Sequence, residues 1–69
     1  MHDHVYRVTE IVGSSSESQD AAIRNAIARA TSTLRNVDWF EVISTRGHVE
    51  GGNIAHFQVT LKVGFRLDD

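Results

Sequence analysis

Residues 56–67 read "HFQVTLKVGFRL", a stretch in which apolar residues alternate with polar or small ones without a break. The apolar positions are Phe57, Val59, Leu61, Val63, Phe65 and Leu67. Because the side chains of a strand point alternately to its two faces, this pattern predicts a strand with one apolar face and one polar face. The rest of the chain must supply a layer that covers the apolar face.

Two further strands are predicted beside this one. The sequence "EGGN" at residues 50–53 is a glycine-rich turn of hairpin length, so residues 38–50 should form a strand antiparallel to residues 56–67. Closer to the N-terminus, "VYRVTEIV" at residues 5–12 is rich in β-branched and aromatic residues. This composition predicts another strand, which Gly13 should end.

A helix is predicted between the first two strands, over about residues 17–35. Ser14 with Glu17, and Ser16 with Gln19, fit the capping box that marks a helix N-terminus. The apolar stripe consists of Ile23, Ile27, Ala30 and Leu34, with Ala22 and Ala26 beside it. Asn36 suits the left-handed residue that often follows a helix.

These elements predict an α+β fold of order β-α-β-β in a single domain over residues 1–69. We expect a three-stranded antiparallel sheet with one helix packed on one face, the face to which Phe40 and Val42 also belong. The opposite face should carry Trp39, Glu41, Ile43, Gln58, Lys62 and Arg66. That mixture is too apolar for ordinary solvent-facing surface, so another subunit or a planar ligand should cover it.

The composition favours a homo-oligomer. A domain as small as 69 residues buries only about 60% of its unfolded surface, and small domains usually gain stability from disulfides, a metal or a partner subunit. The chain has no cysteine, and its four histidines show no metal-ligand spacing, so neither disulfides nor a metal site is expected. Self-association is the remaining support.

Charge and hydropathy exclude several classes of partner. The formal net charge of −2 gives no reason to expect nucleic-acid binding. The longest apolar stretches fall far short of the roughly 20 residues that a membrane span needs. A strand pattern begins directly at the N-terminus, without the features of a secretory signal, so the expected location is cytoplasmic.

Trp39 and Gln58 share the outward face by strand parity, and each side chain has two interpretations. The indole could be an interface residue in a homo-oligomer, or a platform on which a flat ring system stacks. The Gln58 amide could be solvated, or could bind the edge of an amide-bearing heterocycle, since it offers donors and an acceptor.

Arg46 and Arg66 could hold a phosphate, because a guanidinium presents a planar fork of donors; otherwise both are solvated or ion-paired. Strict alternation places Arg46 on the helix side. Arg46 and Trp39 could therefore bind the same ligand only if a bulge brought Arg46 to the opposite face, and Gly47 would allow such a bulge. His48 is either a proton donor or ring contact, or simply exposed. No catalytic residue is expected, because helix capping explains the serines.

Four stretches together resemble the dodecin family: "YRVTEIVGSS", "ARATSTLRNVDWFEV", "RGHVEGG" and "HFQVTLKVGFRL". The resemblance covers nearly the whole chain, and its most specific parts are "DWFEV" and "FQVTLKVGFRL". It implies a hollow dodecamer of β-α-β-β subunits. It also implies paired flavins, stacked between tryptophans of two subunits at sites on two-fold axes.

The resemblance assigns roles to individual residues. Trp39 would stack on the flavin and Gln58 would bind the ring edge, with Asp38 lining the site. The motifs resemble those of bacterial dodecins, which implies FMN as the ligand in preference to riboflavin. Arg46 and Arg66 would then contact the FMN phosphate, and His48 would lie near the flavin pair. Coenzyme A binding is also implied, with four candidate contacts: Tyr6, Arg7, Arg29 and Arg35.

The implied function is flavin storage, buffering and photoprotection rather than catalysis, because a sandwiched ring leaves little room for a substrate. Two alternatives stay open. One is a flavin-dependent oxidoreductase that uses the same site. The other is a structural homo-oligomer without a ligand, in which Trp39 packs against its symmetry mate.

Overall fold

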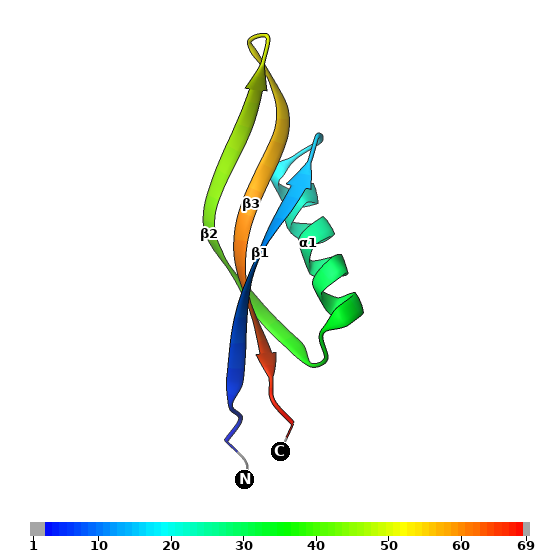
Figure 1. Ribbon diagram of the computed structural model, residues 1–69, viewed down its shortest axis with the longest axis vertical. Helices are drawn as coiled ribbons and strands as arrows, with labels where there is room; N and C mark the ends of the chain where they lie inside the picture. The colour runs from blue at the N-terminus through cyan, green and yellow to red at the C-terminus, as the bar shows by residue number, and fades with distance from the viewer. Residues whose placement is uncertain (1–2, 69) are drawn as a thin grey trace.

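The computed structural model describes residues 3–68 and has the predicted order β-α-β-β (Figure 1). Its elements are β1 (Tyr6–Ser15), α1 (Gln19–Thr33), β2 (Val37–Glu50) and β3 (Asn53–Arg66). The strands form one antiparallel sheet in the order β1-β3-β2, so the strand predicted from residues 56–67 is the central one. The hairpin of β2 and β3 extends beyond the helix at one end of the molecule (Figure 1).

The hairpin turn has the predicted position. Gly51 and Gly52 have φ angles of 57° and 80°, which a two-residue turn between right-twisted strands requires and which glycine adopts without steric cost. β1, in contrast, does not end at Gly13 as predicted. It continues to Ser15, and Gly13 pairs with Val59 of β3.

The helix begins at Gln19, two residues later than predicted. Its N-cap is Ser18, whose hydroxyl oxygen accepts a hydrogen bond from the Ala21 amide at 3.0 Å, while Ser15 accepts from the Glu17 amide in the preceding turn. The predicted pairs, which placed the cap at Ser14 or Ser16, are therefore wrong. Asn36 has a φ of 62° and is the left-handed residue predicted after the helix.

Alanines, rather than isoleucines, form the buried stripe of α1. Ala22, Ala26 and Ala30 are at most 5% exposed and pack against the core of β3, which consists of Val59, Leu61 and Val63. The larger residues of the predicted stripe, Ile23, Ile27 and Leu34, are only partly buried beside it. A Cβ at Gly13 would overlap the Ala22 carbonyl oxygen and the Ala26 Cβ. The helix thus lies so close to β1 that only small side chains fit between them.

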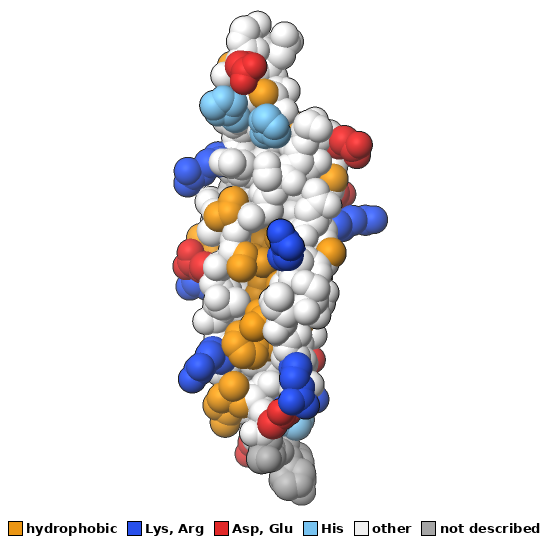
Figure 2. Space-filling model, turned by 45° about the vertical axis from the view of Figure 1, so that its right-hand side comes forward, with side chains coloured by type: hydrophobic (Ala, Val, Ile, Leu, Met, Phe, Trp, Pro, Cys, Tyr) orange, Lys and Arg blue, Asp and Glu red, His pale blue; other side chains and the backbone are white. Residues whose placement is uncertain are grey.

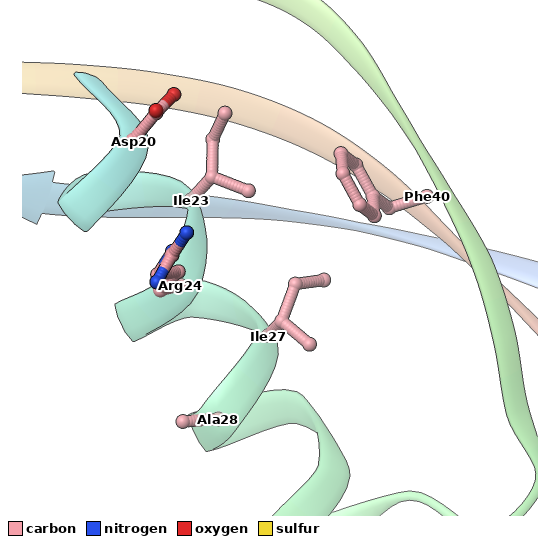
Figure 3. A pocket seen from close by; sticks show the side chains of 6 residues that line it. All are labelled: Asp20, Ile23, Arg24, Ile27, Ala28 and Phe40. Carbon is pink, nitrogen blue, oxygen red and sulfur yellow. The ribbon is translucent and has the colours of Figure 1, made fainter.

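The helix covers β1 and β3, and on β2 it leaves Phe40 and Val42 open while Val37 packs against the core. Phe40 pairs with Val63 and Val42 with Leu61, so both lie on the helix side as predicted. They nevertheless remain 47% and 42% exposed. An open hollow of about 530 Å³ separates α1 from β2, with Ile23 and Ile27 directed towards Phe40 (Figure 3). Hydrophobic side chains accordingly reach the surface in a band along the molecule (Figure 2).

Candidate functional site

The candidate site lies on the face of the sheet away from α1, which we call the outer face. Trp39 of β2 pairs with Gly64 of β3, and residues paired across neighbouring strands share a face. The adjacent pair, Phe40 and Val63, lies on the helix side, where Val63 is fully buried. Trp39 therefore lies on the outer face, as predicted, with 40% of its surface exposed.

Gly64 is the floor beneath the indole. A Cβ at Gly64 would overlap the Cδ2, Cε2 and Cζ2 atoms of Trp39, so the six-membered ring rests directly on the strand backbone. Sequence reasoning treated Gly64 only as one more small residue in the alternation. A glycine within a strand often marks the close approach of another group, and this signal could have identified it.

A bulge brings Arg46 to the outer face. The register of β2 against β3 shifts between Val42 and Ser44, after which Arg46 pairs with Gln58. The irregularity that Arg46 needed is therefore present, although it lies near Ile43 and not at Gly47. Ile43 is the extra residue of the bulge and has no Cα partner in β3. It is not part of the regular alternation that the sequence suggested.

The site residues fall into two groups along the outer face. The tryptophan end comprises Tyr6, Asp38, Trp39, Gly64 and Arg66, and the hairpin end comprises Arg46, His48, His56 and Gln58. Gln58 and Gly64 are six residues apart on β3, which is about 20 Å at the rise of an antiparallel strand. Within one chain the structure therefore does not bring Gln58 to Trp39.

The tryptophan end is held together by contacts between β1 and β2. The Tyr6 hydroxyl donates to Asp38 Oδ2 at 3.2 Å, and the Tyr6 ring centroid lies 6.3 Å from that of Trp39 at an interplanar angle of 49°. Arg66 pairs with Tyr6 and lies two residues from Gly64 on β3. The phenol of Tyr6 and the carboxylate of Asp38 thus lie beside the indole, and Arg66 occupies the neighbouring outward position of β3.

The hairpin end carries an amide, an arginine and two histidines. His48 pairs with His56, with ring centroids 6.3 Å apart, and His48 Nε2 lies 3.8 Å from Glu50 Oε2. His56 was not singled out from the sequence, although it shares the parity of Gln58. Among the ion pairs that residues 3–68 form with one another, none involves Arg46 or Arg66.

The residues suggested as coenzyme A contacts do not share one surface. Tyr6 lies on the outer face, whereas its neighbour Arg7 pairs with Phe65 and points to the helix side. Arg29 belongs to α1, and Arg35 forms an exposed ion pair with Asp68 at 3.5 Å. Coenzyme A binding stays an untested prediction, and the hollow between α1 and β2 is lined by none of its four candidates.

Residues 3–68 contain neither a group of metal ligands nor a membrane-spanning helix. In the part of the chain from residue 3 to 68, no three His, Cys, Asp or Glu side chains are grouped so as to hold a metal ion. The one helix described there is neither long enough nor apolar enough to cross a membrane.

The comparison with known protein families agrees with this geometry. Residues 5–68 match the family model described as Dodecin. The chain belongs to the dodecin family. Flavin binding is known for dodecins, which are small binding and storage proteins that assemble as dodecamers.

Individual dodecins are similar over nearly their whole length. The dodecin of Thermus thermophilus is 49% identical over 65 residues, which are 94% of each chain. The structure of the dodecin from Streptomyces davaonensis is 62% identical with a TM-score of 0.94, covering 99% of this chain and 100% of that one. The calcium dodecin of Mycobacterium tuberculosis, described with a novel calcium-binding site, is 29% identical with a TM-score of 0.81, covering 93% and 91% of the two chains.

Proposed function

We propose that this dodecin stores and buffers FMN by stacking paired flavins between Trp39 side chains of neighbouring subunits in a dodecamer. One observation carries the proposal. The indole of Trp39 lies on the bare backbone of Gly64 and keeps 40% of its surface exposed on the outer face. An aromatic side chain supported from below and open above is a platform for a flat ring.

The energetics favour a ligand on this platform. Because 40% of the Trp39 surface is exposed, apolar area of the indole lies in water, and its burial under an isoalloxazine ring would be favourable. Offset stacking of two aromatic systems adds about 0.5–1.5 kcal/mol beyond that burial. The flavin would supply the visible-light absorption and redox chemistry, while Trp39 supplies the surface that binds it.

The separation of the two ends supports a site shared between subunits. About 20 Å of strand between Gln58 and the Trp39 platform exceeds what a three-ring heterocycle and a glutamine side chain span together. The amide that binds the edge of a ring stacked on Trp39 therefore comes from another copy of the chain. Phe40 and Val42, both nearly half exposed, offer neighbouring subunits apolar surface to bury.

Two guanidinium groups favour FMN over riboflavin. Arg46 and Arg66 lie on the outer face without an ion pair among the described residues. A guanidinium binds a phosphate through two parallel hydrogen bonds, whereas the terminal hydroxyl of riboflavin offers no charge. The Thermus thermophilus dodecin has also been solved as two arginine-to-alanine variants and one tryptophan-to-phenylalanine variant, which are the residue types assigned here.

Storage is favoured over catalysis by the same geometry. Each ring of the pair would lie between an indole and the second flavin and present only its edges, so a substrate could not approach the face through which flavins exchange hydride. A close electron-rich indole also quenches the excited state of a flavin, which provides photoprotection. A flavin-dependent oxidoreductase would need an open flavin face beside a proton donor, and the sandwich leaves no such face.

A fluorescence titration tests the proposal. FMN fluorescence should be quenched as protein is added, to a stoichiometry of about one flavin per chain, and riboflavin should bind more weakly. Trp39→Ala should abolish quenching while size-exclusion chromatography shows an intact oligomer. Val12→Ala is the matched control, because Val12 is a 60% exposed apolar residue on the same face.

The outcomes separate the alternatives. Loss of quenching only in Trp39→Ala supports the flavin site. No quenching of either flavin by the unaltered protein would refute flavin storage. If Trp39→Ala also loses its assembly, the indole is an interface residue and the ligand-free oligomer is the better account.

A further inference from the structure

The Trp39 platform has a neighbour whose role the flavin site does not explain. Tyr6 begins β1 and Trp39 lies near the start of β2, with the end of β3 between them. Because Gly64 has no side chain, nothing on β3 separates the two rings, and their centroids lie 6.3 Å apart. Tyr6 is 40% exposed, as is Trp39.

A second bulge brings Asp38 into the same cluster. Val37 pairs with Phe65 and Trp39 with Gly64, so Asp38 is an extra residue without a Cα partner. In a regular strand, Asp38 and Trp39 would point to opposite faces. A bulge re-aims the side chain it frees, and the carboxylate accepts a hydrogen bond from the Tyr6 hydroxyl at 3.2 Å.

The geometry points to Tyr6 as a positioning residue for Trp39. The hydrogen bond to Asp38 ties β1 to the residue that immediately precedes the indole, and the Tyr6 ring packs beside the indole. Gly64 fixes the indole from below, and Tyr6 limits its rotation from the side. The contact with flavin rests on the proposed function, but the ordering of the indole is a property of the ligand-free protein.

Ordering the platform in advance should strengthen binding. A side chain that is mobile before binding must be immobilised by the ligand, which lowers affinity. A single hydrogen bond with good geometry contributes an amount that corresponds to about a fivefold change in an equilibrium constant. Because this bond is exposed to solvent, we expect Tyr6→Phe to weaken FMN binding about threefold to tenfold and to leave assembly intact.

The single tryptophan of the chain makes the ligand-free test direct. Time-resolved fluorescence anisotropy and near-ultraviolet circular dichroism report on Trp39 in the unliganded oligomer, and an FMN titration of the same samples gives the Kd. Tyr6→Phe and Asp38→Ala remove the hydrogen bond from its two sides. Asp38→Asn retains an oxygen that accepts from the phenol, and Glu41→Gln removes a nearby carboxylate of β2 that bonds to neither ring.

The inference predicts faster local rotation of the indole and weaker FMN binding in Tyr6→Phe and in Asp38→Ala. Rotation of the indole in the ligand-free protein should be close to unaltered in Asp38→Asn, and both rotation and FMN binding should be close to unaltered in Glu41→Gln. The double variant Tyr6→Phe/Asp38→Ala should bind FMN no more weakly than the single variant with the higher Kd, because both substitutions remove the same hydrogen bond.

Anisotropy and Kd unchanged in Tyr6→Phe would overturn the inference. Equal effects in Glu41→Gln would also overturn it, by showing a general effect of charge. If the unaltered protein binds no flavin, the proposed function fails, while the anisotropy of the ligand-free variants still decides whether Tyr6 orders Trp39.

Discussion

Replacing Gly64 by alanine removes the floor of the proposed platform with the smallest available change. The added Cβ would overlap three atoms of the Trp39 six-membered ring. The backbone of β3 cannot move away from the indole, because β3 is paired with β1 on one side and β2 on the other. The indole must therefore tilt or swing away from β3. Any such movement takes the ring out of the plane in which it supports a flavin.

The expected loss of FMN affinity in Gly64→Ala follows from two opposing contributions to the free energy. Overpacking by one methyl group costs about 1–3 kcal/mol, whereas replacing glycine in a strand recovers roughly 0.5–1 kcal/mol of backbone entropy. The difference is a net strain of up to about 2.5 kcal/mol, which is relieved when the indole moves, so the loss then appears as weaker FMN binding. Since about 1.4 kcal/mol is tenfold in Kd, we expect Gly64→Ala to bind FMN about tenfold more weakly, or worse.

Gly47→Ala is the matched control on the neighbouring strand. A Cβ at Gly47 would meet its nearest atoms at 3.8 and 3.9 Å, which is ordinary van der Waals contact. The assay combines an FMN fluorescence titration with the emission maximum of Trp39 in the ligand-free protein. Gly64→Ala should shift the emission and raise the Kd, and Gly47→Ala should do neither. A Gly64→Ala protein with unaltered emission and Kd would refute the placement of the indole on Gly64.

Three further predictions concern the helix contact, the core and the phosphate. Gly13→Ala should lower the free energy of unfolding by about 3 kcal/mol in urea denaturation, since its Cβ would overlap the backbone of α1; unaltered stability would contradict the close helix packing. Leu61→Ala should cost about 2–5 kcal/mol in the same assay, because Leu61 is fully buried, and a loss below that range would contradict its central place. Arg46→Ala should weaken FMN binding about tenfold in fluorescence titrations at low salt, as expected for a lost charge-assisted hydrogen bond, and should leave riboflavin binding unchanged; an equal loss for both ligands would remove Arg46 from phosphate recognition.

Much of the fold could be predicted because it depends on local patterns. The alternation of residues 56–67 specified the central strand, the glycines of residues 50–53 specified the turn, and the two periodicities in order specified β-α-β-β. The outward position of Trp39 followed from parity alone. The family resemblance added the flavin, its stoichiometry and the dodecamer, none of which the pattern contains.

The details that were missed depend on distances between elements. Ala22 and Ala26 form the buried stripe because Gly13 lets α1 approach the sheet, and a helical wheel does not show how close that approach is. The bulge near Ile43 has no glycine or proline to mark it, so strict alternation placed Arg46 on the wrong face. The hydrogen bond from Tyr6 to Asp38 joins residues 32 positions apart, and its geometry depends on a bulge that the sequence does not announce.

A crystal structure of the oligomer grown with FMN would test the central claim most directly. The account predicts flavin rings stacked on Trp39 between neighbouring chains. At each ring, the Gln58 amide at the edge and the Trp39 indole on the face should belong to two different chains. A structure in which Trp39 packs against protein, with FMN absent or bound elsewhere, would contradict it.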